Sequence, residues 1–332
     1  IGSGGGFNVN WDSVWDVKTE RGEYGWSAEF AIPFKTLRYK KDDNQSWGIN
    51  FERVIARRKE ESHWSPISRQ FTMNRLLSAG TIEGINVPLA RNTKVMPYIL
   101  GQRNRIIDEG TTENEDSNFG LDAKVSVGSS MTLDLTYNTD FAQVEADEQQ
   151  INLDRFSLFF PEKRAFFLEN AGLFSVGSGG GYSGPDIEMF FSRRIGVGSD
   201  GIPVPIIGGG RLTGTLSGMK VGILSMVTDK VKDVTDQNNY SVLRLKKELP
   251  NRTHIGGMYT ALDHTGHGGY INQSYAIDAQ LGLGELNKII VFAGLTDTPG
   301  LNKDNSYAFK IEGARDAKTV SSSLSYTEVG AN

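Results

Sequence analysis

The chain has 332 residues, which is enough for two domains, and a formal net charge of -5. That charge argues against a nucleic-acid partner, and the absence of cysteine excludes a disulfide framework and a thiolate metal site. No stretch approaches the roughly 20 apolar residues of a membrane-spanning helix.

Residues 1–90 differ in character from the rest of the chain, because they contain all five tryptophans. Dense charge between Arg53 and Glu61 is typical of an exposed strand end or loop. We interpret this region as part of a β-sandwich, with residues 87–90 as the linker that follows it. Its strands are predicted near residues 24–31, 47–57 and 80–86.

Beyond the linker, apolar and polar residues alternate with the two-residue period of a β-strand. Tyr275 and Ile277 alternate with Asp278, for example, and Phe309 is followed by Lys310. The predicted strands are about as long as a tilted strand that crosses a bilayer. They are expected near residues 94–103, 119–127, 131–138, 206–215, 219–227, 239–248, 253–263, 273–283, 288–296, 306–315 and 319–328.

The connections between these strands are alternately short and long. Tight turns such as 128–130 and 216–218 alternate with long connections such as 103–118 and 228–238. This pattern is typical of a transmembrane β-barrel with short periplasmic turns and long extracellular loops, which places residues 1–90 on the periplasmic side. A soluble β-sandwich or solenoid is the alternative.

The predicted strand number is odd, whereas bacterial single-chain barrels have even numbers. The chain begins at Ile1 without a signal peptide and ends at Asn332 without a terminal aromatic strand. We therefore expect a piece of a longer protein. Residues 1–90 would be the C-terminal part of the sandwich, and residues 91–332 the N-terminal part of the barrel.

Residues 139–205 form an insertion after the third predicted barrel strand. A connection this long is functional, disordered or folded on itself, and its many phenylalanines argue against disorder. A short helix is predicted at residues 153–160, before Pro161. The segment is expected to be either a plug folded into the barrel or an extracellular cap.

Charged residues of both signs in the insertion would pair with lumen-facing partners such as Asp134, Lys220 and Arg244. The predicted network consists of Glu145, Asp147, Glu162, Lys163, Arg164, Glu169, Arg193 and Arg194.

Residues 138–174, 190–196 and 208–218 resemble a family of bacterial outer-membrane β-barrel proteins of unknown function (domain of unknown function 5916). Residues 25–39 and 47–66 resemble the C-terminal half of the family-9-like carbohydrate-binding domain that precedes the barrel in this family. The resemblance covers nearly the whole chain, although Ala165 stands where the family often has proline.

This resemblance implies an all-β fold in which a partial carbohydrate-binding-like β-sandwich precedes an incomplete antiparallel transmembrane β-barrel with a plug-like insertion. It also implies a bacterial outer-membrane location, with lipid and a carbohydrate ligand as partners. No cofactor is expected, and a structural calcium ion in the sandwich is the alternative.

Flat indole rings stack on the C–H face of a sugar, so the tryptophans are the candidate carbohydrate contacts. Trp26 and Trp47 lie at predicted strand positions, where a core role is the competing interpretation. Trp64 follows the charged segment and is expected to be exposed.

No catalytic residue is assigned. The pairs Glu60–Glu61 and Glu145–Asp147 are better explained as salt-bridge partners than as an acid–base pair, since neighbours in sequence do not define a catalytic separation. His264 and His267 lack a third metal ligand.

The function predicted from the sequence is uptake or handling of glycans or their fragments. Two alternatives stay open. One is a membrane-associated hydrolase acting on glycosidic bonds, and the other is a structural barrel whose sandwich binds the cell wall or a protein partner.

Overall fold

The computed structural model describes most of the chain. Of residues 100, 102–108, 110–116, 118, 165 and 316 it describes only the backbone. The described residues are 15–34, 37, 39, 44–69, 71–73, 76–87, 93–108, 110–128, 130–139, 162, 164–177, 187–198, 204–232, 234–265, 269–301, 303–317 and 320–331.

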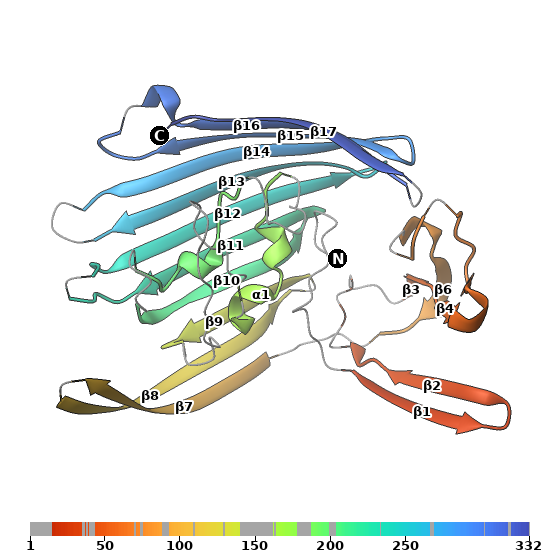
Figure 1. Ribbon diagram of the computed structural model, residues 1–332, viewed down its shortest axis with the longest axis horizontal. Helices are drawn as coiled ribbons and strands as arrows, with labels where there is room; N and C mark the ends of the chain where they lie inside the picture. The colour runs from red at the N-terminus through yellow and green to blue at the C-terminus, as the bar shows by residue number, and fades with distance from the viewer. Residues whose placement is uncertain are drawn as a thin grey trace.

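An antiparallel sheet of eleven strands dominates the fold, and its strands follow one another in chain order from β7 to β17. Figure 1 shows it as a curved sheet with β7 at one edge and β17 at the other. All eleven predicted strands are confirmed. They are β7 (Thr93–Asp108), β8 (Gly110–Val127), β9 (Met131–Tyr137), β10 (Ile206–Leu216), β11 (Met219–Thr228), β12 (Asn238–Leu249), β13 (Thr253–His264), β14 (Ile271–Leu283), β15 (Asn287–Asp297), β16 (Tyr307–Asp316) and β17 (Ser321–Val329).

The long polar loop predicted at residues 103–118 is wrong, because β7 and β8 continue through it as a hairpin. Their backbones stay paired from Arg103 opposite Glu115 to Asp108 opposite Gly110. Polarity misled the prediction, since a strand ladder needs only backbone partners and does not require apolar side chains.

The other connections alternate in length as predicted. The β10–β11 turn is tight, and its two central residues, Ser217 and Gly218, both have positive φ angles, of 49° and 73°. Such a turn twists the chain in the same sense as the flanking strands, which is why it closes a short hairpin. The next connection, residues 229–237, is long.

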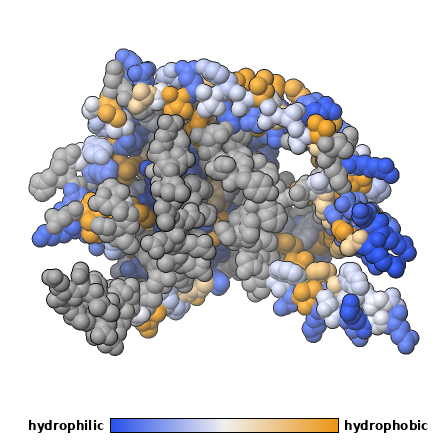
Figure 2. All heavy atoms as spheres, in the orientation of Figure 1, coloured by the Kyte–Doolittle hydropathy of each residue, from blue (hydrophilic) through white to orange (hydrophobic). Residues whose placement is uncertain are grey.

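Alternate side chains of the large sheet lie on opposite faces, as the sequence predicts. Ile277 is 66% exposed, whereas its neighbour Asp278 is 4% exposed. Phe309 and Lys310 differ in the same way on β16. In Figure 2, hydrophobic residues gather along the upper edge, where Figure 1 places β16 and β17.

The apolar outer face continues across the sheet, and its exposed side chains come from nearly every strand. They include Val95, Phe119, Leu135, Ile223, Leu243, Ile255, Tyr275, Leu295, Ile311 and Leu324.

The described part of the insertion lies against the inner, concave face of the sheet (Figure 1). It contains the short helices α1 (Ala165–Leu168), η4 (Ala171–Leu173) and η5 (Ser192–Arg194). Phe167, Phe174 and Ile195 are buried against the sheet. Their partners in this core are Ile206, Leu224, Met226, Val242, Met258, Ala276 and Phe292. The predicted helix at 153–160 lies outside the described residues.

The N-terminal region forms three two-stranded antiparallel sheets in the part that is described. Figure 1 shows these small sheets to one side of the large sheet. They pair β1 (Asp16–Gly22) with β2 (Gly25–Ala31), β3 (Gln45–Ile49) with β6 (Gly80–Ile85), and β4 (Glu52–Ile55) with β5 (Glu60–His63). Two 3-10 turns also occur here, η2 (Ala56–Arg58) and η3 (Leu76–Ser78), and a further one, η6 (Lys303–Asn305), precedes β16.

The strand predicted at 47–57 is therefore two strands. Asn50 ends the first one, because its side chain forms hydrogen bonds with the backbone N–H and C=O of Ser65, at 2.8 and 3.1 Å. The charged segment from Arg53 to Glu61 is a hairpin with η2 at its tip. The complete β-sandwich stays a prediction.

Candidate functional site

A row of alternating charges crosses three neighbouring strands on the inner face. Lys124 on β8 lies directly opposite Asp134 on β9, which lies directly opposite Arg211 on β10. The Arg211 guanidinium is 2.8 Å from one carboxylate oxygen of Asp134, and the Lys124 ammonium is 3.4 Å from the other. Arg211 and Asp134 are both buried, and burying a charge is costly unless it is paired. The ion pair between them offsets that cost.

The same row holds the insertion. Arg211 donates hydrogen bonds to the backbone carbonyls of Phe166 and Glu169, at the C-terminal end of α1. The last carbonyls of a helix lack partners within it, and a cation is favourable at that end. Lys124 completes the attachment through an ion pair with the Glu169 carboxylate. The sheet therefore binds the insertion through Lys124 and Arg211, and also through the Thr213 hydroxyl on β10, which accepts a hydrogen bond from the Asn170 amide at 3.0 Å.

A second cluster joins two parts of the insertion to each other, and we call it the clasp: Glu162, Arg164, Ser192 and Ile195. Arg164 binds both carboxylate oxygens of Glu162 at 2.8 Å. It also donates to the backbone carbonyls of Ser192 and Ile195, each at 2.7 Å. The Ser192 hydroxyl donates to Glu162 at 2.7 Å.

The clasp is buried, and its charges are compensated. The Arg164 guanidinium carbon also lies 4.2 Å from the centre of the Phe167 ring, a favourable cation–π contact. Burial alone would raise the pKa of the Glu162 carboxyl, but the hydrogen bonds and charge of Arg164, with the Ser192 hydroxyl, outweigh it. The pKa of Glu162 is therefore held below its ordinary value of 4.5.

A third buried pair lies farther across the sheet and spans an intervening strand. Arg244 on β12 and Asp278 on β14 form a bidentate ion pair at 2.6 and 2.9 Å. Between them, on β13, is Gly256, where an added Cβ would lie 2.5 Å from Arg244 and 2.9 Å from Asp278. Glycine at this position gives the two side chains room to meet, and His254 lies 3.6 Å from Asp278.

The predicted charge network is present in part. Glu162, Arg164 and Glu169 take part in the contacts above. Arg193 and Arg194 lie in η5, where the clasp uses the backbone carbonyls of their neighbours rather than their guanidinium groups. Glu145, Asp147 and Lys163 lie outside the described residues.

Of the predicted lumen partners, only Asp134 belongs to the row that holds the insertion. Lys220 pairs with Glu248, and Arg244 pairs with Asp278. Sequence reasoning missed Arg211, which donates hydrogen bonds to two backbone carbonyls of the insertion. Its inward position on a strand and the opposite charge at Asp134 were the available signal, but the register between those strands was not known.

The three tryptophans do not form one site. Trp47 is half-buried in a cluster with Phe34 and Tyr39, so the core interpretation holds for it. Trp26 is 60% exposed, and the core interpretation is wrong there because β1 and β2 are exposed along nearly their whole length.

Trp64 is exposed, as predicted. Its ring packs edge-on against Phe51 and covers Gly80, where an added Cβ would meet the indole at 2.3 Å. A flat and accessible indole face is what sugar stacking requires, so Trp64 stays a candidate together with Trp26.

Within the described ranges, no group of three or more His, Asp or Glu side chains could hold a metal ion. His267, one half of the predicted histidine pair, lies outside those ranges. The described helices include none that is long and apolar enough to cross a membrane.

Residues 91–203 match the sequence model of the family described as "Domain of unknown function (DUF5916)". The match spans β7 to β9 and nearly all of the insertion, so it contains Lys124, Asp134 and the whole clasp. No curated protein and no solved structure matches the chain. The predicted resemblance is confirmed for this domain, and the carbohydrate-binding domain before it stays a prediction.

Replacing Gly256 with alanine should push Arg244 and Asp278 apart. We expect the free energy of unfolding to fall by roughly 1–3 kcal/mol, the usual cost of overpacking. Gly257→Ala is the matched control, because an added Cβ there would lie 3.6 Å from its nearest neighbour, the Ala276 carbonyl oxygen, which is an ordinary contact. It should be neutral or stabilise by up to about 1 kcal/mol, since glycine weakens a strand. Urea unfolding followed by circular dichroism measures the free energy of unfolding of both variants, and equal effects would contradict this explanation.

The clasp should open in acid. A carboxyl whose pKa is lowered by folding stabilises the folded state above its unfolded pKa, here about 4.5, and loses that contribution as the pH falls through the folded value. Amide hydrogen exchange of residues 187–198, corrected for the intrinsic exchange rate, should therefore become faster as the pH falls below about 4.5. In Glu162→Gln, exchange should be fast at every pH. An identical pH response in both proteins would show that Glu162 is not responsible.

Proposed function

We propose that this chain forms the wall and the plug of a bacterial outer-membrane β-barrel that handles or takes up glycans or their fragments. The observation that carries the proposal is the division of the large sheet into an exposed apolar face and an inner face with buried charges. Water would make the apolar face costly, because exposed apolar area is unfavourable by roughly 25 cal/mol per Å². Lipid removes that cost.

The lengths of the strands and the sorting of the turns support the same proposal. Strands β10 to β17 have 9–13 residues, close to the roughly 9–11 that a tilted strand needs to cross a bilayer. A sheet that spans a membrane has to close, because unpaired edge groups are not tolerated in hydrocarbon. We therefore propose that additional strands pair with the edge strands β7 and β17.

The insertion is proposed to act as the plug. It packs on the inner face through Phe167, Phe174 and Ile195, and it is tied there by Arg211. The clasp then holds its two halves together. A segment attached in this way would occupy the lumen, whereas an extracellular cap would leave the inner face to water.

Glycan handling is supported by the sequence resemblance of residues 25–39 and 47–66 to a carbohydrate-binding domain. The exposed rings of Trp26 and Trp64 are the proposed contacts, and a Cβ-free position at Gly80 accommodates the second ring. In the proposed topology this N-terminal region is periplasmic, on the side of the tight turns.

A lysine on the outer face should oppose insertion. Ile277→Lys should reduce the stability of the membrane-inserted protein by roughly 2–4 kcal/mol if the site is near the middle of the bilayer. Refolding into lipid vesicles at a series of urea concentrations gives that free energy. Glu285→Lys, in the tight turn after β14, is the control that should change little. Equal stability of Ile277→Lys and wild type would rule out lipid contact at Ile277.

Opening the clasp should open the pore. The double variant Glu162→Ala/Arg164→Ala should show several-fold higher single-channel conductance in planar bilayers than wild type, because the two halves of the plug are no longer joined. Lys230→Ala is the control, since it removes an exposed ion pair with Asp236 outside the insertion. If the wild type already conducts as an open pore, and the double variant and Lys230→Ala conduct equally well, the insertion is a cap and not a plug.

A further inference from the structure

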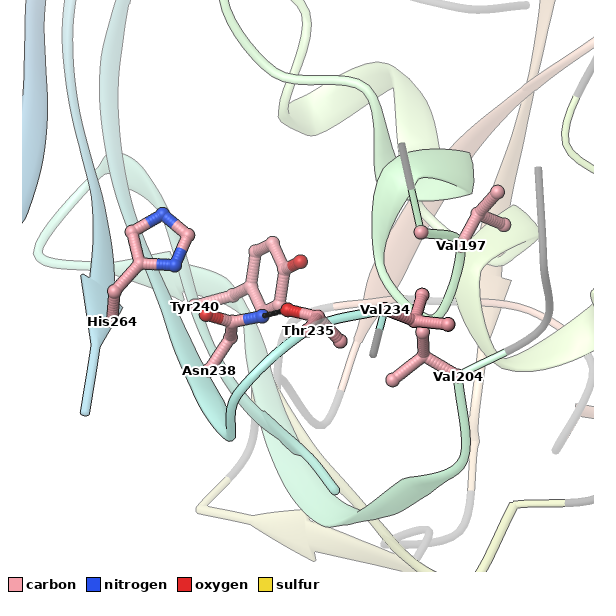
Figure 3. Close-up of a pocket in the computed structure, with 8 residues that line it drawn as sticks. Val197, Val204, Val234, Thr235, Asn238, Tyr240 and His264 are labelled. Carbon is pink, nitrogen blue, oxygen red and sulfur yellow. Dashed lines mark hydrogen bonds between the residues drawn. The ribbon is translucent and has the colours of Figure 1, made fainter. Parts of the chain in front are cut away.

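The two ends of strand β12 place different side chains on the inner face of the sheet. At the long-loop end, Asn238 and Tyr240 line a small pocket together with valines (Figure 3). At the tight-turn end, the residues that alternate onto the inner face are Arg244, Lys246 and Glu248. All three are charged, and the first two are buried. The charge of β12 on this face is therefore concentrated at the tight-turn end.

Lys246 has no counter-charge of its own among the described residues. It is 4% exposed, and it forms no ion pair or hydrogen bond with any residue that the structure describes. The two carboxylates near it are engaged elsewhere. Both oxygens of Asp278 accept hydrogen bonds from Arg244, and Glu248 pairs with Lys220. A buried ammonium group without an anion is costly, so this position calls for one.

A second lysine adds to that cost. Lys246 on β12 lies directly opposite Lys220 on β11, and both residues belong to the inner face. Like charges at directly opposite positions of an antiparallel strand pair destabilise the pair. A single anion bound beside the two ammonium groups would relieve both the unpaired burial and the repulsion.

The Lys246 ammonium group can be reached from the lumen side. Among the described residues, the side-chain atoms that are enclosed without a hydrogen-bond partner do not include the Lys246 nitrogen. Because this nitrogen has no partner either, it must retain accessible surface. The side chain of Lys220 beside it is 42% exposed, so an anion can approach along that side chain.

We infer that Lys246, with Lys220 beside it, is a binding site for the carboxylate or phosphate group of an anionic ligand. Hydrogen bonds between an ammonium group and such an oxyanion are about twice as strong as neutral ones. The inference goes beyond the proposed function and does not depend on it, because the contacts that carry it lie within the sheet. Two sources offer the same chemical group, namely an acidic sugar of a glycan and free phosphate.

The test is calorimetric titration of the full chain in micelles of an uncharged detergent without a sugar headgroup. The buffer has low salt and contains no phosphate or carboxylate, since salt screens such an interaction. The probes are inorganic phosphate and methyl glucuronide, with methyl glucoside as the neutral comparison. At least one of the two anions should bind, and the glucoside should not. Tighter binding of phosphate would identify free phosphate as the ligand, and tighter binding of the glucuronide an acidic sugar.

Lys246→Met removes the charge while keeping a long side chain, and it should weaken the binding of the anion at least tenfold through loss of a charged hydrogen bond. Lys247→Met is the matched control. It removes the same charge from the next position of β12, which is exposed on the outer face. This variant should bind as wild type, and circular dichroism should show that both variants are folded.

Unfolding in urea gives an independent measurement. In the buffer without added anion, Lys246→Met should have a midpoint equal to or higher than that of wild type, because it removes an unpaired buried charge. Addition of the anion that binds should raise the midpoint of wild type and of Lys247→Met, but not that of Lys246→Met.

Three results would overturn the inference. If neither anion binds to the wild type, or if the glucoside binds equally well, the site does not recognise negative charge. If binding is undiminished in Lys246→Met, the anion is bound elsewhere. If Lys246→Met has a lower urea midpoint than wild type in the buffer without added anion, the ammonium group already has a partner within the chain.

Discussion

The rest of the structure depends on the pairing of buried charges across the inner face of the large sheet. Arg211 is the centre of that arrangement, because it binds Asp134 on the neighbouring strand and two carbonyl oxygens at the end of α1. A buried guanidinium without partners would be far too costly, and removing one member of such a pair costs about 3–5 kcal/mol. Its partners therefore fix the register of three strands and the position of the insertion at the same time.

The same logic explains why the inner face accepts charge at all. Arg244 and Asp278 are both buried, and they are paired across a strand that carries glycine between them. Buried pairs of this kind contribute little net stability compared with apolar residues, but they are specific about geometry. On the outer face the exposed side chains are mostly aliphatic or aromatic, and such groups need no hydrogen-bond partner. Paired charges therefore set the arrangement on the inner face, and the apolar outer face is the basis of the proposed lipid contact.

The architecture of the large sheet could be predicted from the sequence because its signal is local. A two-residue alternation specifies the faces, and residues such as Ser217 and Gly218 specify tight turns, without any knowledge of tertiary contacts. The hairpin at 103–118 was missed because polar residues stand at nearly every position there, so apolar and polar residues do not alternate. The contacts of the insertion were only partly predictable, since choosing Arg211 over Arg193 as the main anchor requires the register of β9 and β10. Whether Trp47 on β3 or Trp26 on β2 is buried likewise depends on what packs over each strand, which a single strand's pattern does not reveal.

The central claim is that the two faces of this sheet meet different environments, lipid outside and a filled lumen inside. The chain has no cysteine, so single cysteines with spin labels can be placed along β14 from residue 273 to residue 281 without background. In lipid vesicles, labels at Tyr275, Ile277 and Ala279 should be accessible to oxygen dissolved in the bilayer and protected from a water-soluble relaxing agent. Labels at Ala276 and Asp278 should be protected from oxygen. If the outer positions were accessible to the water-soluble agent, or if accessibility showed no two-residue period, the account would be contradicted.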